Sequence, residues 1–295
     1  MAEFIFSAFA DEAGDSVEEQ IAALRENGIH LIEPRFFDKR GVLDLTEEEL
    51  TEVRRKLDAG GITVGSLGSP VGKYAIDGDF DEYMNTTFRR ALRAAEILGT
   101  KRMRIFSFFV PQDTLAAHRE EVMRRMNKMV RVAAECGIML CHENETAIYG
   151  QMPGEVRELL TEVPGLYGIF DPANYVMNGA NPYEGIGATL IRPGYLHIKD
   201  AIYKTQTIVP AGEGEGAIGD IIDIVNGHTD GRVMLTLEPH LALFAAFKSI
   251  DAHTELRGNH VFNNNREAFD CAVRSLEALM TSRGYRKDGN GIWKR

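Results

Sequence analysis

Residues 138–147, IMLCHENETA, begin as an apolar run of strand type and end in a histidine and two glutamates. A strand can leave a core on any turn residues, so three ionisable side chains at that point indicate a role beyond turning the chain. Three later segments have a similar form, namely LYGIFD at 166–171, YLHIKD at 195–200 and VMLTLE at 233–238. We therefore predict four consecutive strands that finish in carboxylate, carboxylate, imidazole and carboxylate.

The first half of the chain carries four more apolar runs: EFIFSAF (3–9), IHLIEPR (29–35), ITVGSL (62–67) and RMRIFSF (102–108). Between the runs lie amphipathic segments with helical spacing. We expect helices over residues 16–28, 46–61, 80–98, 113–136, 154–162, 217–227 and 263–283. The first of these opens with a serine three residues before a glutamate and closes on a glycine, which is a helix-capping pattern.

Strands that alternate with helices imply right-handed crossovers and a parallel sheet. Eight such units without a linker favour one (β/α)8 TIM barrel over an open doubly wound sheet, and 295 residues suit a barrel of this kind. A Rossmann-type sheet would carry GxGxxG after its first strand, whereas residues 7–15 read SAFADEAGD. We expect a single domain over residues 1–295, with residues 284–295 as a C-terminal tail.

The GEGEG segment at 212–216 contains two glutamates, which would repel a phosphate group. We therefore predict a mobile loop rather than a phosphate cradle.

Composition narrows the classes of function. The net charge of -11 argues against non-specific binding to nucleic acid. No apolar run approaches the roughly 18 residues of a membrane-spanning helix, and the acidic N-terminus lacks the positive region of a signal peptide. The three cysteines show no CxxC spacing and suggest reduced thiols. We therefore expect a cytoplasmic protein that binds neither nucleic acid nor membrane, and a homo-oligomer remains open.

In a barrel, the chemistry lies at the carboxyl ends of the strands, where the loops that lead into the helices converge. The four strand ends described above would bring together Glu143, Asp171, His197 and Glu238. Three carboxylates and an imidazole aimed at one axis would repel each other unless a cation sat among them. This donor set suits Mn²⁺, Mg²⁺, Co²⁺ or Zn²⁺ and lacks the thiolates that would select Zn²⁺ or Cu⁺. The sequence thus predicts one divalent metal ion.

Each of these residues alone has an ordinary explanation. FDPAN (170–174) would pass as a turn, and a single histidine in YLHIKD is more often a core residue than a ligand. The joint pattern favours the metal site, because the ordinary explanation requires four consecutive strands to end in ligand-type residues by accident. Side chains two positions apart in a strand point to the same face, so His197 shares a face with Tyr195 and Lys199.

The motifs HENE (142–145), FDPAN (170–174), YLHIKDA (195–201), VPAGEGEG (209–216) and LEPHL (237–241) occur in this order. This series resembles the xylose isomerase-like TIM-barrel superfamily of sugar isomerases and epimerases. SLGSPVGKY (66–74) also matches a recurrent motif of that superfamily, so the resemblance covers nearly the whole chain.

The resemblance implies that Glu143, Asp171, His197 and Glu238 hold one divalent metal, and that the two glutamates handle the proton of the substrate. Glu145 shares strand parity with Glu143 and is the rival for the first ligand. We prefer Glu143 because it directly follows the apolar run.

Four further residues are candidates for substrate binding. Glu33 ends the second predicted strand and would reach a distal hydroxyl. Lys73 and Lys199 would neutralise a substrate carboxylate, phosphate or enediolate. Asn174 would hydrogen-bond a sugar hydroxyl or a metal-bound water, with an Asx turn as the equal alternative. Sugar enzymes of the superfamily often have a histidine at the position of Asn174, so this sequence departs from their pattern at a substrate-handling position.

The function that follows is a metal-dependent isomerase or epimerase of a sugar, keto-sugar or polyol, acting by proton abstraction next to a metal-bound carbonyl. The alternative is a keto-inositol-type dehydratase on the same scaffold. An abasic-site endonuclease is less favoured. The resemblance implies that such enzymes hold a three-metal cluster with many histidine ligands, and this chain has only eight histidines in all. A non-enzymatic sugar-binding protein is also disfavoured, because the ligand set is intact.

Overall fold

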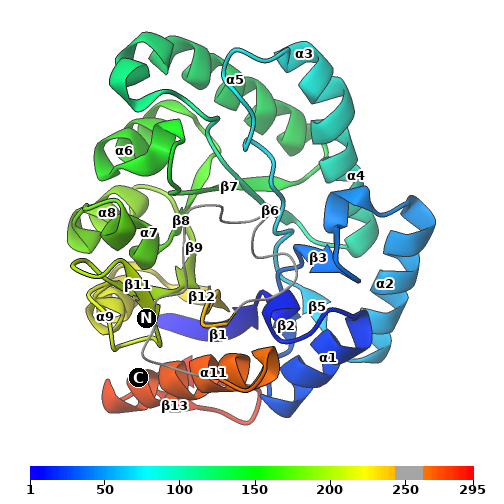
Figure 1. Ribbon diagram of the computed structural model, residues 1–295, viewed down its shortest axis with the longest axis vertical. Coiled ribbons are helices and arrows are strands. Elements are labelled where there is room, and N and C mark those ends of the chain that lie inside the picture. The colour runs from blue at the N-terminus through cyan, green and yellow to red at the C-terminus, as the bar shows by residue number, and fades with distance from the viewer. Residues whose placement is uncertain (243–261) are drawn as a thin grey trace.

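Eight parallel strands form a closed barrel in the computed structural model, which describes residues 1–242 and 262–295 (Figure 1). β1 pairs with both β12 and β2, and β5 pairs with β2. Leu67, just beyond β5, bridges to Met103 in β6 and closes the ring. The strands are β1 (Ala2–Ala8), β2 (Leu31–Ile32), β5 (Thr63–Val64), β6 (Arg102–Ile105), β7 (Met139–Glu143), β8 (Tyr167–Phe170), β9 (Pro193–Ile198) and β12 (Gly231–Leu237). The predicted (β/α)8 barrel is confirmed, and all eight predicted strands are present.

Helices surround the strands as an outer ring (Figure 1). Each predicted helical segment contains a helix, although residues 80–98 divide into α3, a π-helical segment (Met84–Phe88) and α4. The sequence prediction missed α7 and α8. The helices are α1 (Val17–Glu26), α2 (Glu47–Ala59), α3 (Phe80–Tyr83), α4 (Arg89–Leu98), α5 (Leu115–Glu135), α6 (Pro153–Glu162), α7 (Pro172–Met177), α8 (Pro182–Thr189), α9 (Ile218–His228) and α11 (Asn265–Ser282).

The predicted cap of α1 is confirmed. The Ser16 hydroxyl accepts from the backbone N–H of Glu19, and the Glu19 carboxylate accepts from the backbone N–H of Ser16. Gly28, after the helix, has a φ of 64°, which suits a glycine at a helix end. Local sequence therefore sets where this helix begins and ends.

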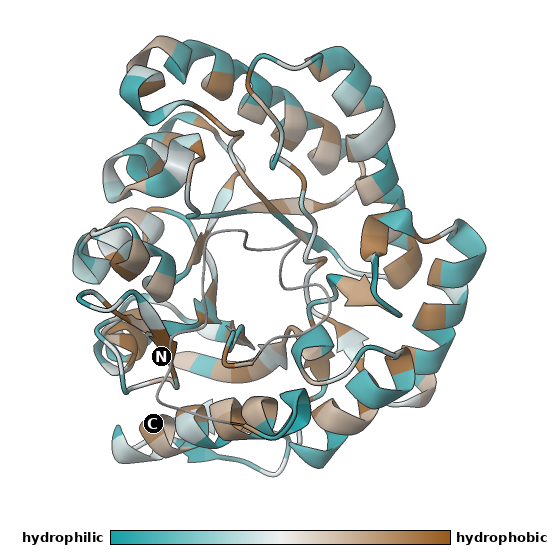
Figure 2. Cartoon of the chain, viewed as in Figure 1, coloured by the Kyte–Doolittle hydropathy of each residue, from teal (hydrophilic) through white to brown (hydrophobic). Residues whose placement is uncertain are grey.

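The main hydrophobic core lies between the strands and the ring of helices. Figure 2 shows apolar residues on the strands and on the helix sides that face them, with polar residues facing outward. Strands buried on both faces are close to continuously apolar, which is why their positions could be predicted from short apolar runs. Within the described residues, no helix is both long enough and apolar enough to cross a membrane.

The C-terminal tail forms a small hairpin, β13 (Arg286–Lys287) and β14 (Ile292–Lys294). β14 pairs antiparallel with the first half of β1, where Phe4 lies opposite Trp293. Trp293 is only 4% exposed and stacks on Phe6 at 5.5 Å between ring centroids. The tail therefore packs against the barrel itself.

Two further hairpins lie in loops: β3 (Phe36–Phe37) with β4 (Arg40–Gly41), and β10 (Asp200–Ile202) with β11 (Thr207–Val209).

The GEGEG segment follows β11 and wraps around Asp200. The backbone N–H groups of Gly212, Gly214 and Gly216 all donate to the Asp200 carboxylate, at 2.8 to 3.1 Å. These three hydrogen bonds anchor the segment and do not support the expectation of a mobile loop.

Gly72, in the SPVGKY motif, packs directly against the strand beside it. Its φ is 91°, and an added Cβ would lie 2.0 Å from the carbonyl oxygen of Phe106. Replacing Gly72 by Ala should lower the free energy of unfolding by more than about 2 kcal/mol, because both the backbone conformation and the contact become strained. Gly154→Ala is the matched control, since its Cβ would meet nothing within 4 Å. Equal unfolding midpoints for the two variants in urea would contradict this account.

Candidate metal centre and active site

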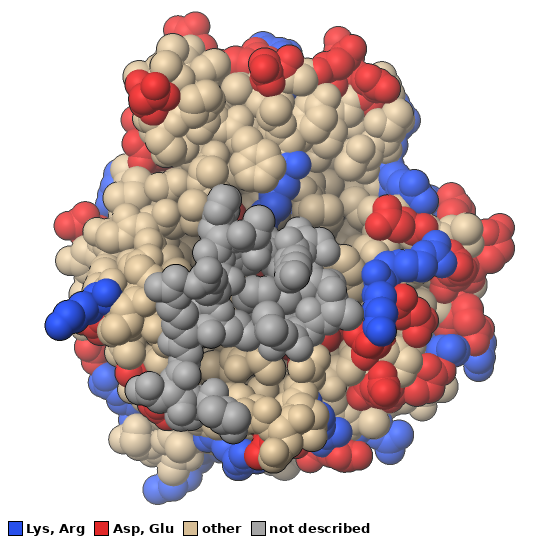
Figure 3. Space-filling view, viewed as in Figure 1, with Lys and Arg blue, Asp and Glu red and all other residues tan. Residues whose placement is uncertain are grey.

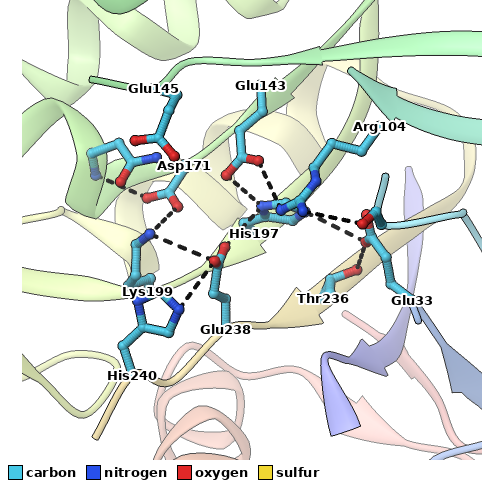
Figure 4. Close-up of polar contacts among 12 residues, drawn as sticks. Glu33, Arg104, Glu143, Glu145, Asp171, His197, Lys199, Thr236, Glu238 and His240 are labelled. Atoms are coloured by element: carbon cyan, nitrogen blue, oxygen red, sulfur yellow. Dashed lines mark hydrogen bonds and ion pairs between the residues drawn. The ribbon is translucent and has the colours of Figure 1, made fainter. Parts of the chain in front are cut away.

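Four predicted ligands converge at the carboxyl end of the barrel. Glu143 ends β7, Asp171 follows β8, His197 lies in β9 and Glu238 follows β12. These strands are consecutive neighbours in the sheet, so their ends reach the same place. One ligand atom from each residue lies within 4.8 Å of the others, and all four residues are buried (Figure 4).

His197 lies between the two glutamates. Its Nδ1 atom is 2.9 Å from Glu143 Oε1 and 3.1 Å from Glu238 Oε2. Figure 4 shows the glutamates reaching the ring from different strands, with Asp171 and Lys199 beside them. Nδ1 is therefore the ring nitrogen that faces the other ligand residues.

Two buried arginines, missed from the sequence, hold the outer oxygens of the two glutamates. Arg104 Nη1 donates to Glu143 Oε2 at 3.1 Å, and Arg35 Nη1 donates to Glu238 Oε1 at 3.2 Å. The one available signal in the sequence was Arg104, which lies inside the apolar run RMRIFSF. An arginine buried with such a strand requires an acidic partner. Each glutamate therefore has one oxygen fixed by an arginine and the other directed at the centre.

Acidic side chains outnumber basic ones around this centre. Arg35 also donates to the carboxylates of Asp11 and Glu12, both buried. Six buried acidic side chains thus surround three buried basic side chains, although burial raises the pKa of Glu12 to about 8 and so leaves that group uncharged at neutral pH. These are Asp11, Glu12, Glu33, Glu143, Asp171 and Glu238, with Arg35, Arg104 and Lys199. Like charges held this close favour binding of a cation.

The pKa shifts show which groups carry charge. Burial raises the pKa of Asp171 to about 7, against the opposing charge of Lys199. Burial also acts to raise the pKa of Glu143, but the charges of His197 and Arg104 outweigh it and lower that pKa to about 2. For Lys199, burial acts to lower the pKa, but Asp171 and Glu238 outweigh it and raise the pKa above its usual range. Glu143 is therefore anionic and Lys199 cationic at neutral pH.

The residues fit a bound divalent cation. Asp171 Oδ2 and Glu238 Oε2 are buried without a hydrogen bond, although Lys199 Nζ lies 2.9 Å from the former and His197 Nδ1 lies 3.1 Å from the latter. Buried carboxylate oxygens are normally hydrogen-bonded or bound to a metal. Three carboxylates and one imidazole are ligands that Mn²⁺, Mg²⁺, Co²⁺ and Zn²⁺ accept.

Asn174 helps to hold the ligand loops. Its side chain donates to the backbone oxygen of Asn144 at 2.8 Å, and its backbone N–H donates to Asp171 Oδ1. The side chain of Asn144 in turn binds both the backbone N–H and the backbone oxygen of Asp171. Asp171 is thus the N-cap of α7, and its Oδ2 atom remains directed at the centre.

Lys73 and Glu145 form an ion pair at 2.9 Å, outside the four-residue cluster, and the two side chains are partly exposed. This position supports Glu143 over Glu145 as the first ligand. Glu33 lies behind His197, fully buried, with its oxygens bound to Tyr195 and Thr236. Its position does not support the predicted contact with a distal substrate hydroxyl.

His240 also belongs to this region, next to Glu238. Its Nε2 atom lies 3.3 Å from Glu238 Oε1, and its backbone N–H donates to Glu12 at 2.7 Å. The φ of 47° is uncommon for a residue with a side chain, and strained conformations of this kind cluster at functional sites. The PH dipeptide of LEPHL gave no signal that this loop residue would be buried.

The family model of the xylose isomerase-like TIM barrel matches residues 21–253, which is most of the chain. The protein therefore belongs to this family, and the predicted resemblance is confirmed. A comparison with curated protein sequences gave no significant match.

Solved structures share the fold at low identity. The probable 3-DHS dehydratase AsbF from Bacillus anthracis has a TM-score of 0.69 at 16% identity, covering 95% of this chain and 98% of that chain. D-psicose 3-epimerase from Clostridium cellulolyticum H10, solved with D-tagatose, has a TM-score of 0.70 at 13% identity, covering 94% and 98%. The IolI protein, solved with a zinc atom, has a TM-score of 0.72 at 13% identity, covering 95% and 99%.

Proposed function

We propose that the protein is a divalent-metal-dependent isomerase or epimerase that acts on a sugar, keto-sugar or polyol by removing a proton next to a carbonyl. The observation that carries this proposal is the convergence of Glu143, Asp171, His197 and Glu238 within 4.8 Å, in a buried site at the carboxyl end of the barrel. The structural similarity to a D-psicose 3-epimerase supports a carbohydrate substrate.

A carboxylate is too weak a base to remove a proton beside a carbonyl unless the developing negative charge is stabilised. A divalent cation held by the four ligand residues would supply that stabilisation as a Lewis acid. Lys199 adds a second positive charge, since its ammonium lies 2.9 Å from Asp171 and 3.8 Å from Glu238. In this proposal Lys199 donates a hydrogen bond to a substrate oxygen.

Glu143 and Glu238 are the proton-transfer groups. Arg104 and Arg35 fix one oxygen of each, so the other oxygens stay directed at the substrate position. One glutamate removes a proton and the other returns one. Return to the opposite face of the same carbon gives epimerisation, and return to the neighbouring carbon gives isomerisation.

Dehydration of a keto-inositol or related polyol is the second candidate. It needs the same base together with a group that stabilises the departing hydroxyl group, and the buried ammonium of Lys199 would hydrogen-bond that oxygen. The structural similarity to a probable 3-DHS dehydratase favours keeping this candidate.

The charge distribution supports a small molecule as the ligand. The net charge of -11 opposes binding to a phosphate backbone, and Figure 3 shows acidic and basic side chains interspersed around the described part of one face. We extend the proposal to a cytoplasmic enzyme of carbohydrate metabolism that binds neither nucleic acid nor membrane.

Assays of a keto-sugar and inosose panel in D₂O test these proposals. An isomerase or epimerase should place solvent deuterium on the carbon next to the carbonyl and leave the elemental composition otherwise unchanged. A dehydratase should give a product that has lost one water. If the metal-loaded protein exchanges no substrate proton and forms no product across the panel, the proposed function is contradicted.

A further inference from the structure

We propose that Glu33 is a positioning residue that holds the proton of His197 on Nε2 and so leaves Nδ1 available to the cation. This inference rests on the proposed metal site. It replaces the substrate-binding role predicted for Glu33 from the sequence.

The two ring nitrogens of His197 face different groups. Nδ1 lies 2.9 Å from Glu143 and 3.1 Å from Glu238, whereas Nε2 lies 3.4 Å from Glu33 Oε2. A neutral imidazole carries one N–H, and the nitrogen that carries it cannot bind a metal. In this structure Nδ1 donates to Glu143, and a cation at the centre would take the place of that proton. A carboxylate facing Nε2 would then favour the tautomer whose remaining proton is on Nε2.

Neighbouring rings restrict the orientation of this imidazole. The Phe9 ring meets it edge-on at 5.0 Å between centroids, and the Tyr195 ring packs at 5.5 Å. Nε2 itself forms no hydrogen bond with the described residues, and its 3.4 Å separation from Glu33 is an ion-pair distance.

Glu33 itself is held in place by neutral donors. The Tyr195 hydroxyl donates to Oε1 at 2.6 Å and the Thr236 hydroxyl donates to Oε2 at 3.0 Å. Within the described residues, His197 is the only basic side chain within ion-pair distance of Glu33. A carboxylate that is 0% exposed and has no arginine or lysine partner is costly to bury, so its retention indicates a role at the imidazole.

The first experiment measures metal affinity. Metal-stripped wild type, Glu33→Gln and Thr236→Val are titrated with Zn²⁺ in competition with a chromophoric chelator. Glu33→Gln should weaken binding by about 10- to 100-fold, because the ring loses its charged acceptor. Thr236→Val is the matched control, since it removes a hydroxyl from the same carboxylate oxygen but keeps the carboxylate. It should weaken binding by less than about 3-fold.

The second experiment reads the tautomer and needs no variant of Glu33. In Zn²⁺-loaded wild type with ¹⁵N-labelled histidine, His197 should show a protonated Nε2 and a metal-bound Nδ1. A metal-bound Nε2, or a Glu33→Gln variant that binds Zn²⁺ as tightly as wild type, would overturn the role of Glu33 while leaving the proposed function standing. A wild type that binds no Zn²⁺ would overturn the metal site and this inference together.

Discussion

Glu238→Gln should lower turnover by about 10³-fold or more while leaving the protein folded. Gln keeps the shape of the side chain but cannot accept a substrate proton, and it removes one anionic ligand from the centre. Burial acts to raise the pKa of Glu238, but Lys199, His197 and His240 outweigh it and lower that pKa well below its usual range, so loss of the charge should also lower the stability of the metal-free fold. The measurement is kcat on whichever substrate the panel identifies, together with the thermal midpoint of the metal-free protein.

Glu145→Gln is the matched control for this prediction. Glu145 makes its ion pair with Lys73 and lies outside the four-residue cluster. Its loss should reduce turnover by less than about 10-fold. Turnover close to wild type in Glu238→Gln, or an equal loss in both variants, would refute the assigned role of Glu238.

Arg35→Met should destabilise the metal-free protein by about 3–5 kcal/mol. The guanidinium is buried and binds three carboxylates, those of Asp11, Glu12 and Glu238. Its removal leaves these three acids close together without their shared cation. Urea unfolding followed by the fluorescence of Trp293, the single tryptophan, measures the loss.

Arg93→Met provides the comparison for Arg35. Arg93 also pairs with two carboxylates, Glu47 and Glu96, but its side chain is 49% exposed. Solvent screens these pairs, so the loss should be far smaller than that of Arg35→Met. Similar losses for the two variants would show that burial of the Arg35 cluster does not matter to stability.

The barrel and the convergence of the four proposed ligand residues could be predicted because each signal is local. A parallel strand is a short apolar run, and its carboxyl end lies at the catalytic face in this fold. The capping pair Ser16 and Glu19 is local as well, since the two residues are three positions apart. These features can be recognised without knowing which segments meet.

The missed features depend on contacts between distant segments or on short elements. Arg35 and Glu238 are 203 positions apart, so nothing near either residue indicates the pair. Glu33 was predicted to bind substrate because it ends a strand, yet its side chain faces His197 in the folded protein. α7 and α8 begin at prolines and span six and eight residues, too short for a helical period to emerge.

The most direct test of the account is the stoichiometry and location of bound metal. Metal-stripped protein should bind about one Mn²⁺ or Zn²⁺ per chain, and Asp171→Asn should weaken that binding by at least about 10-fold with the protein still folded. A wild type that takes up no divalent ion, or an Asp171→Asn variant that binds it as tightly, would contradict a cation held by these four side chains.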